Sequence, residues 1–166
     1  LCQTRNIVKD KLYPKDCEKL VNSHLMYFTN KLRPITQRLT RMLVRKLQMD
    51  KGLVAAETPR GQARMTMTVN PTAINFELDI VEKMLDQLDN KLQESQAKYF
   101  GNTMSIADIL FYMEISTLQF FLKREIVQPN TKLAQWFHEY MHIEPSIGIL
   151  DDRLREALDV YEQMNQ

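Results

Sequence analysis

The segment HEYMH, from His138 to His142, has the His-Glu-x-x-His spacing of a zinc-binding helix. Histidines at i and i+4 lie on one helix face, where Glu139 could act as a general base. A zinc site with two protein ligands is incomplete, so a third would have to come from Glu156, Glu162 or a nearby aspartate. Short motifs of this kind often arise by chance. We therefore interpret both histidines as surface residues and predict no metal site.

A second group of candidate residues lies in the basic stretch from Lys31 to Lys51, which carries seven basic residues and one acidic residue. Helical spacing places three arginines on one stripe that flanks the apolar face: Arg38, Arg41 and Arg45. The segment from Glu77 to Glu94 carries six acidic and two basic residues. Two interpretations stay open. The two segments are neighbouring helices with complementary faces, or the stripe docks an acidic protein or anionic lipid through its guanidinium groups.

Other kinds of chemistry find little support in the sequence. Few aromatic residues interleave with the basic ones and the net charge is only +1, so we expect no nucleic-acid partner. We find no nucleophile paired with a base, no Gly-rich phosphate loop and no carboxylate pair that demands a catalytic role. The sequence therefore predicts no catalytic residue in this chain.

The spacing of apolar residues indicates the helices that position these side chains. The first helical pattern covers about residues 15 to 49, and Pro34 in its middle predicts a kink because proline lacks a backbone donor. About residues 50 to 72 carry two glycines and two prolines and predict a long loop. A second helix is expected to start at Asn70-Pro71, with Asn70 as the N-cap.

The third helix opens with a Ser-x-x-Asp capping box formed by Ser105 and Asp108. From Ile106 to Leu122 its residues are apolar nearly all the way round, which predicts a helix at the centre of a bundle. A fourth helix follows Pro129-Asn130 and is expected to end at Pro145, and a last one covers about Asp151 to Met164. The fold class is therefore all-α, a bundle of about five or more helices around a buried central helix.

The overall composition agrees with one compact helical domain covering residues 1–166. The sequence has no apolar stretch long enough for a transmembrane helix and no signal-peptide pattern. Cys2 and Cys17 are too few for a disulfide framework, so we expect free thiols in an intracellular, reducing compartment. The choice between the cytoplasm and an organelle such as the mitochondrion stays open.

The order of these elements resembles the C-terminal half of the glutathione transferase fold. The resemblance rests on Phe100-Gly101, on Ser105-Ile106-Ala107-Asp108, and on the later Leu133, Trp136 and Pro145. Tyr13-Pro14 and Asp16 look like the start of the domain in theta-like members. The resemblance implies that the capping box begins the buried central helix. It also implies an apolar substrate pocket between the first and third helices, bordered here by Tyr13, Tyr27 and Tyr112.

Enzymes of that family carry an N-terminal thioredoxin-like domain, which supplies the catalytic residue and most glutathione contacts. These 166 residues contain no such pattern. We therefore predict a non-catalytic protein-interaction or scaffold domain, an accessory subunit of a larger assembly. We expect other protein subunits as partners, with a homodimer as a further option, and no cofactor. The alternative is the substrate-pocket half of a glutathione transferase whose catalytic domain lies outside this chain, and glutathione is expected only in that case.

Overall fold

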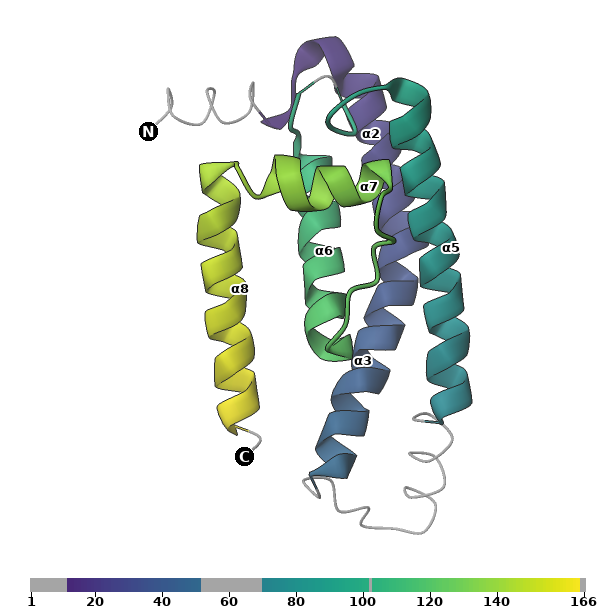
Figure 1. Cartoon of the computed structure of the whole chain (residues 1–166), viewed down its shortest axis with the longest axis vertical. Coiled ribbons are helices and arrows are strands. Elements are labelled where there is room, and N and C mark those ends of the chain that lie inside the picture. Colours follow the sequence, from purple (N-terminus) through teal and green to yellow (C-terminus); the bar gives the residue numbers. More distant parts are fainter. Residues whose placement is uncertain (1–11, 52–69, 102, 165–166) are drawn as a thin grey trace.

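Helices make up all the regular structure in the computed structural model, which describes residues 12–51, 70–101 and 103–164 (Figure 1). In chain order the elements are the 3-10 helix η1 (Lys15–Cys17), α2 (Glu18–Tyr27), the π-helix η2 (Phe28–Leu32), α3 (Arg33–Asp50), α5 (Pro71–Ser95), α6 (Ile106–Leu122), α7 (Lys132–Gln135), the π-helix η3 (Trp136–Met141) and α8 (Pro145–Met164). No strand occurs within those ranges, so the predicted all-α class is confirmed.

The first predicted helix is one nearly continuous rod formed by α2, η2 and α3 (Figure 1). Its interruption lies at η2, where the backbone N–H of Arg33 bonds the carbonyl of Phe28, five residues earlier. Pro34 follows directly and occupies the first turn of α3. Proline has no backbone N–H to donate. The π-turn before Pro34 therefore interrupts the regular hydrogen bonds between residues four apart at a position where no donor is left without a partner.

The next helix, α5, runs antiparallel to α3 and packs along it (Figure 1). Asn70 is its N-cap, as predicted, and the Asn70 side chain accepts a bond of 2.9 Å from the backbone N–H of Thr72. Gln96, in the left-handed conformation with φ of 55°, ends the helix. The predicted loop at about residues 50 to 72 lies mostly outside the described residues, which leave out 52–69. At its two edges, Asp50 is the last residue of α3 and Pro71 is the first residue of α5.

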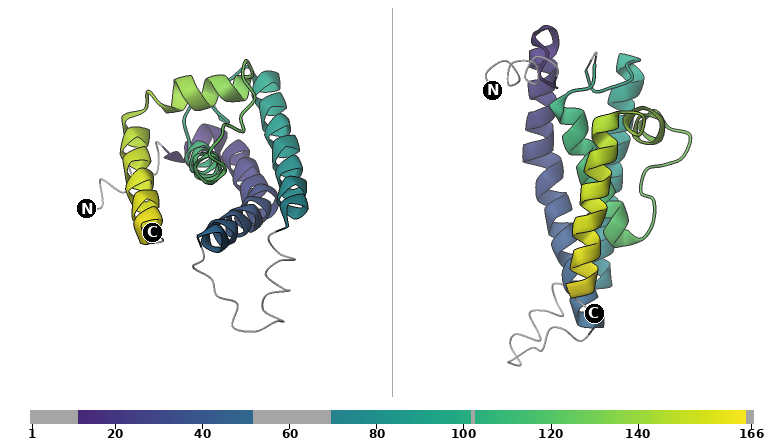
Figure 2. Two further views of the ribbon diagram at one scale, coloured as in Figure 1. Left: turned by 60° about the horizontal axis from the view of Figure 1, so that its bottom comes forward. Right: turned by 90° about the vertical axis from the view of Figure 1, so that its left-hand side faces the viewer.

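At the centre of the bundle stands α6, with the other long helices arranged around it (Figure 2). None of its 17 residues is exposed, whereas α5 carries exposed residues along its whole length. Phe111, Ile115 and Leu118 form its fully buried stripe. The apolar character of this helix therefore reflects its central position. No helix in the described ranges combines the length and apolarity needed to cross a membrane.

A short crossing element, α7 with η3, packs over α5 and carries the fully buried Trp136. The prediction that Pro145 ends this element was wrong. The element ends at Met141, and Pro145 is the first residue of α8, six residues before the predicted start at Asp151. The physical reason is that proline is tolerated at the first position of a helix, where its missing N–H would have no intrahelical partner.

A buried histidine joins α2 to the turn before α6. His24 is 6% exposed and packs against the rings of Phe100 at 5.3 Å and Phe111 at 6.4 Å. Its Nδ1 atom has no hydrogen-bond partner among the described residues. Burial, aided by the charge of Lys91, lowers the pKa of His24 from 6.5 to about 4. The imidazole is therefore neutral in the folded protein at neutral pH.

We predict that acid destabilises the fold through His24. Between pH 6.5 and about 4 the unfolded chain binds more protons than the folded chain, so stability falls as the pH falls through this window. The loss should reach about 2–3 kcal/mol at the acid end. Urea unfolding at several pH values should show a flatter dependence for His24→Gln than for wild type. His138→Gln, at an exposed position, is the control and should follow wild type. Equal slopes in all three proteins would contradict this assignment.

Candidate functional site

The start of α6 is organised by one buried carboxylate. Asp108 accepts four hydrogen bonds: at Oδ2 from the Ser105 backbone N–H (2.9 Å) and Ser105 Oγ (2.7 Å), and at Oδ1 from the Phe100 backbone N–H (2.9 Å) and Trp136 Nε1 (3.1 Å). Ser105 is the N-cap of the helix, as the Ser-x-x-Asp pattern predicts. The carboxylate thus ties together the helix start, the preceding turn and η3.

The electrostatics of Asp108 combine two opposing effects. Burial raises the pKa of its carboxyl group, while each of the four donors favours the charged form and lowers it. The bonds from Phe100 and Trp136 are not part of a capping box and were missed by the sequence analysis. The sequence offered one indication of the Trp136 bond, because a buried tryptophan needs an acceptor for its indole N–H.

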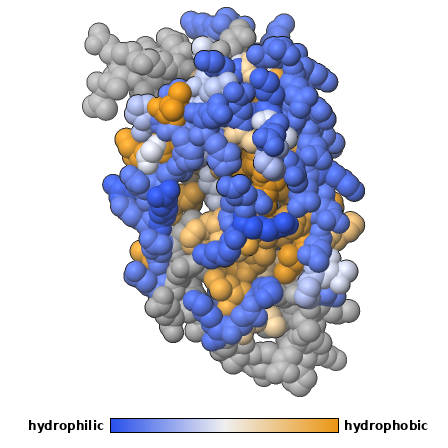
Figure 3. All heavy atoms as spheres, viewed as in Figure 1, coloured by the Kyte–Doolittle hydropathy of each residue, from blue (hydrophilic) through white to orange (hydrophobic). Residues whose placement is uncertain are grey.

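The side of α6 that faces away from Phe111 and Leu118 carries apolar side chains that the other helices do not cover completely. Ile109, Met113 and Phe120 are spaced to lie on one stripe, and all three are only partly buried. The fully buried residues Phe111 and Leu118 occupy the other side of the helix. Figure 3 shows apolar surface gathered in a hollow over the middle of the molecule, between α8 and the α3–α5 pair. We call Ile109, Met113 and Phe120 the open stripe of α6.

A cavity of about 310 Å³ lies next to the open stripe, between α6, η3 and α8. Phe120, Phe137 and Leu154 supply its apolar wall. Its polar side holds Tyr112, which donates a hydrogen bond of 2.7 Å to Asp151 on α8. His142 Nδ1 lies 3.4 Å from the Tyr112 hydroxyl and 3.6 Å from Asp151 Oδ2.

The three tyrosines expected around one apolar pocket are not brought together. Tyr13 bonds the side chain of Asn22. Tyr27 faces α5, where its hydroxyl donates to Gln87 at 3.1 Å and its ring lies under Lys91. Tyr112 faces the other way, toward η3 and α8. Of the three, Tyr112 alone lines a described cavity, and that cavity lies between α6 and α8, away from the predicted place between the first and third helices.

The three arginines of the stripe do not all fit the same interpretation, contact with the neighbouring helix or docking of a partner. Arg38 pairs with Glu77 of α5 at 3.0 Å, and the Glu77 side chain is only 15% exposed, so Arg38 joins neighbouring helices inside the bundle. Arg41 and Arg45 are exposed. A role for these two in binding a partner stays a prediction.

The His-Glu-x-x-His segment falls in η3. The rings of His138 and His142 lie 6.4 Å apart, centroid to centroid. Glu139 accepts a hydrogen bond of 3.1 Å from Gln135, and His142 lies beside Asp151. In the part of the chain that the structure describes, no group of three or more histidine, cysteine, aspartate or glutamate side chains is placed to hold a metal ion.

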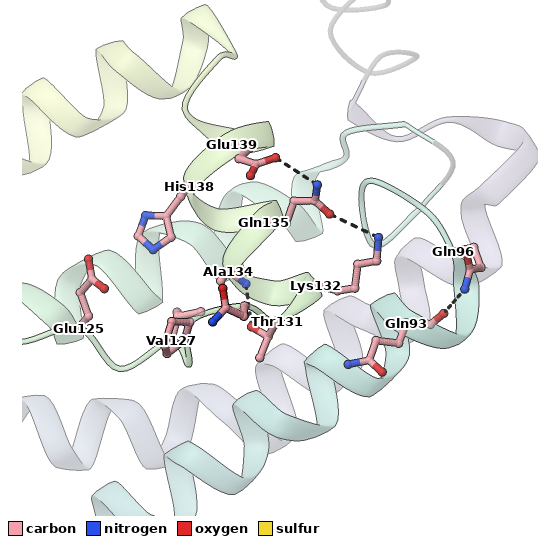
Figure 4. Close-up of a pocket in the computed structure, with 12 residues that line it drawn as sticks. Gln93, Gln96, Glu125, Val127, Thr131, Lys132, Ala134, Gln135, His138 and Glu139 are labelled. Carbon is pink, nitrogen blue, oxygen red and sulfur yellow. Dashed lines mark hydrogen bonds between the residues drawn. The ribbon is translucent and has the colours of Figure 1, made fainter.

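A hollow of about 860 Å³ lies between the end of α5, the segment after α6, and α7 with η3 (Figure 4). Its lining is mostly polar. Gln135 bridges two charged neighbours, accepting from Lys132 at 3.3 Å and donating to Glu139 at 3.1 Å, and Gln96 bonds the carbonyl of Gln93. These side chains satisfy one another, which is typical of a solvated surface and not of a preorganised catalytic site.

The described residues thus form an all-α bundle around a capped, buried central helix. The family model described as "Glutathione S-transferase, C-terminal domain" matches residues 63–148, just over half of the chain. The chain therefore belongs to this family, and the predicted resemblance is confirmed. The match includes the whole Asp108 cluster with Phe100, Ser105 and Trp136. Neither the comparison with curated proteins nor that with solved structures gave a match.

We predict that the hydrogen bonds of Asp108 contribute more unfolding free energy than an ordinary helix cap does. Ser105→Ala should cost about 1 kcal/mol of unfolding free energy, the usual value of a cap. Asp108→Ala should cost at least about 3 kcal/mol, because it leaves several buried donors without acceptors. The loss of unfolding free energy for Asp108→Asn should lie between the losses for Ser105→Ala and Asp108→Ala. Urea unfolding measures all three, and equal losses for Asp108→Ala and Ser105→Ala would show that the Phe100 and Trp136 bonds contribute nothing.

Proposed function

We propose that this chain is a non-catalytic protein-interaction domain, an accessory or scaffold subunit of a larger assembly. The open stripe of α6 is the observation that carries the proposal. Ile109, Met113 and Phe120 lie partly exposed on the helix that forms the centre of the bundle. Apolar surface gathered in a hollow is typical of a site that another protein covers (Figure 3). A partner that filled this hollow would enclose α6 on all sides.

The hydrogen bonds of three tyrosines support a non-catalytic role. Glutathione chemistry needs a group that stabilises the thiolate, because the thiolate is the nucleophile. Burial raises the pKa of Tyr27, and burial together with Glu144 raises that of Tyr99 to about 12. Burial and the bond to Asp151 raise the pKa of Tyr112 as well. A neutral phenol can stabilise a thiolate only by donating its O–H, and the hydroxyls of Tyr27, Tyr99 and Tyr112 already donate to Gln87, Glu144 and Asp151 inside the domain.

A second candidate function follows from family membership. The chain would be the substrate-pocket half of a glutathione transferase, with glutathione bound mainly by a thioredoxin-like domain outside these residues. The cavity of about 310 Å³ beside Tyr112 favours this alternative, because Phe120, Phe137 and Leu154 form one apolar wall of it and its size suits a small molecule. The two functions differ in what occupies the space next to α6, which is a protein surface in the first and an electrophilic small molecule in the second.

The open stripe should contact the partner directly. A photoreactive p-benzoylphenylalanine in place of Met113 should give a discrete covalent adduct on irradiation in cells. The same replacement at Phe76, an exposed apolar residue of α5, is the matched control and should not give that adduct. Once mass spectrometry identifies the partner, Met113→Asp should weaken its binding at least about tenfold, whereas Phe76→Asp should not.

Enzyme assays decide between the two candidate functions. The purified chain should not conjugate glutathione to 1-chloro-2,4-dinitrobenzene above the uncatalysed rate, and immobilised glutathione should not retain it. Turnover that Tyr112→Phe abolishes, together with no adduct from Met113, would overturn the interaction proposal and favour the transferase half.

The exposed arginines are proposed to contact an acidic surface of the same partner. Arg41→Glu with Arg45→Glu should weaken binding and leave the far-ultraviolet circular dichroism unchanged, because both side chains are exposed. Arg38→Glu should instead lower stability by about 1 kcal/mol, since it places a second carboxylate against Glu77. Unchanged partner binding in the double variant would contradict this role. Binding to phosphatidylserine vesicles, or salt-sensitive self-association, would identify anionic lipid or a second copy as the acidic ligand instead.

A further inference from the structure

The last helix, α8, is attached to the bundle mainly through its first two turns. Ile147 is fully buried and Leu150 packs against the core. From Asp152 to Gln163, every side chain that the structure describes is exposed except that of Leu154, which is partly buried. Figure 1 shows α8 beside α6 at the edge of the bundle, directly after the crossing element. Few contacts therefore hold the greater part of this helix in place.

Among the described residues, a polar contact holds α8 against α6 beyond its first turn. The Asp151 side chain, 15% exposed, accepts the hydrogen bond of 2.7 Å from Tyr112 and lies 3.6 Å from His142 Nδ1. Tyr112 is itself fixed, because its ring stacks on Phe137 at 4.8 Å with an interplanar angle of 28°. The bundle side of this contact is thus rigid. We call Tyr112, His142 and Asp151 the clasp.

A weak point in the helix lies between its anchor and the clasp. Gly148 follows the buried Ile147 and precedes Asp151 by less than one turn. No atom lies within 4 Å of the position that a Cβ at Gly148 would occupy, so packing does not require glycine there. Glycine lowers helix stability by about 1 kcal/mol relative to alanine. The connection to η3 is fixed by Tyr99, whose hydroxyl donates to Glu144 at 2.9 Å.

From these features we propose that α8 is a hinged arm whose clasp at Asp151 controls access to the open stripe of α6. With the clasp closed, α8 forms one wall of the hollow (Figure 3) and of the cavity that Phe120 and Leu154 line. When Asp151 leaves Tyr112 and Leu150 leaves its contact with the core, the arm bends near Gly148, separates from α6 and widens the hollow. The consequence for partner binding rests on the proposed function, whereas the movement of the arm does not.

Hydrogen exchange measured by mass spectrometry on the whole chain tests the arm without any partner. A free helix of this length is only marginally stable in water, so opening of the clasp should speed exchange of its amides. Asp151→Ala and Tyr112→Phe should each raise exchange in peptides after Asp151 by about tenfold or more, the effect expected from losing a bond to a charged group. Asp152→Ala, at the exposed neighbouring position, is the matched control and should match wild type. Gly148→Ala should slow exchange.

Several results would overturn the proposal. Unchanged exchange in both clasp variants would show that the Asp151 contact does not hold the arm. Equal increases in Asp151→Ala and Asp152→Ala would assign the effect to the loss of a negative charge on α8 and not to the clasp, because the higher helix propensity of alanine acts in the opposite direction. A rise that extends into α5 and α6 would mean that α8 unfolds only with the whole domain. Tyr112→Phe keeps the ring that stacks on Phe137 and so remains informative if Asp151→Ala does not fold.

Discussion

A single buried carboxylate sets the geometry of this domain. Asp108 is fully buried and its charge is compensated by four donors from three places in the chain. An ionised group without such partners would be strongly destabilising in the interior. The requirement for partners fixes the direction in which α6 starts and the position of the crossing element that brings Trp136 to it. The packing of Phe100 against Phe111 and Trp136 then follows from the same arrangement.

The central helix α6 has one side that is buried in the bundle and one side that stays partly exposed. Its closed side carries Phe111, Ile115 and Leu118 and holds the bundle together. Its open stripe leaves part of its apolar surface in water, and that part adds no stability to the isolated chain. A helix that is apolar all round therefore carries, in adjacent residues, side chains that hold the bundle together and side chains that we propose to contact a partner. The same helix also carries Tyr112, which connects the folded core to the sparsely packed α8.

Features that depend on local spacing could be predicted from the sequence. The Asn70 cap, the Ser105–Asp108 box and the central position of α6 all follow from residues within one or two turns. The start of α8 was misplaced because Pro145 can either follow a helix or begin one, and only the surrounding structure decides. The tyrosines were grouped wrongly because their directions depend on the rotation of each helix about its axis. Pairs such as Trp136 with Asp108 and Arg38 with Glu77 join distant residues, and spacing alone does not contain them.

The indole of Trp136 gives the molecule an intrinsic optical reporter. It is the one tryptophan among the 166 residues, it is fully buried, and its N–H is bonded to Asp108. Tryptophan emission from this protein therefore originates at a single position in the middle of the core. Its wavelength and its quenching by acrylamide report whether water has reached the carboxylate beside it. Any homologue or variant that retains this pair can have the integrity of its core followed in solution without a label.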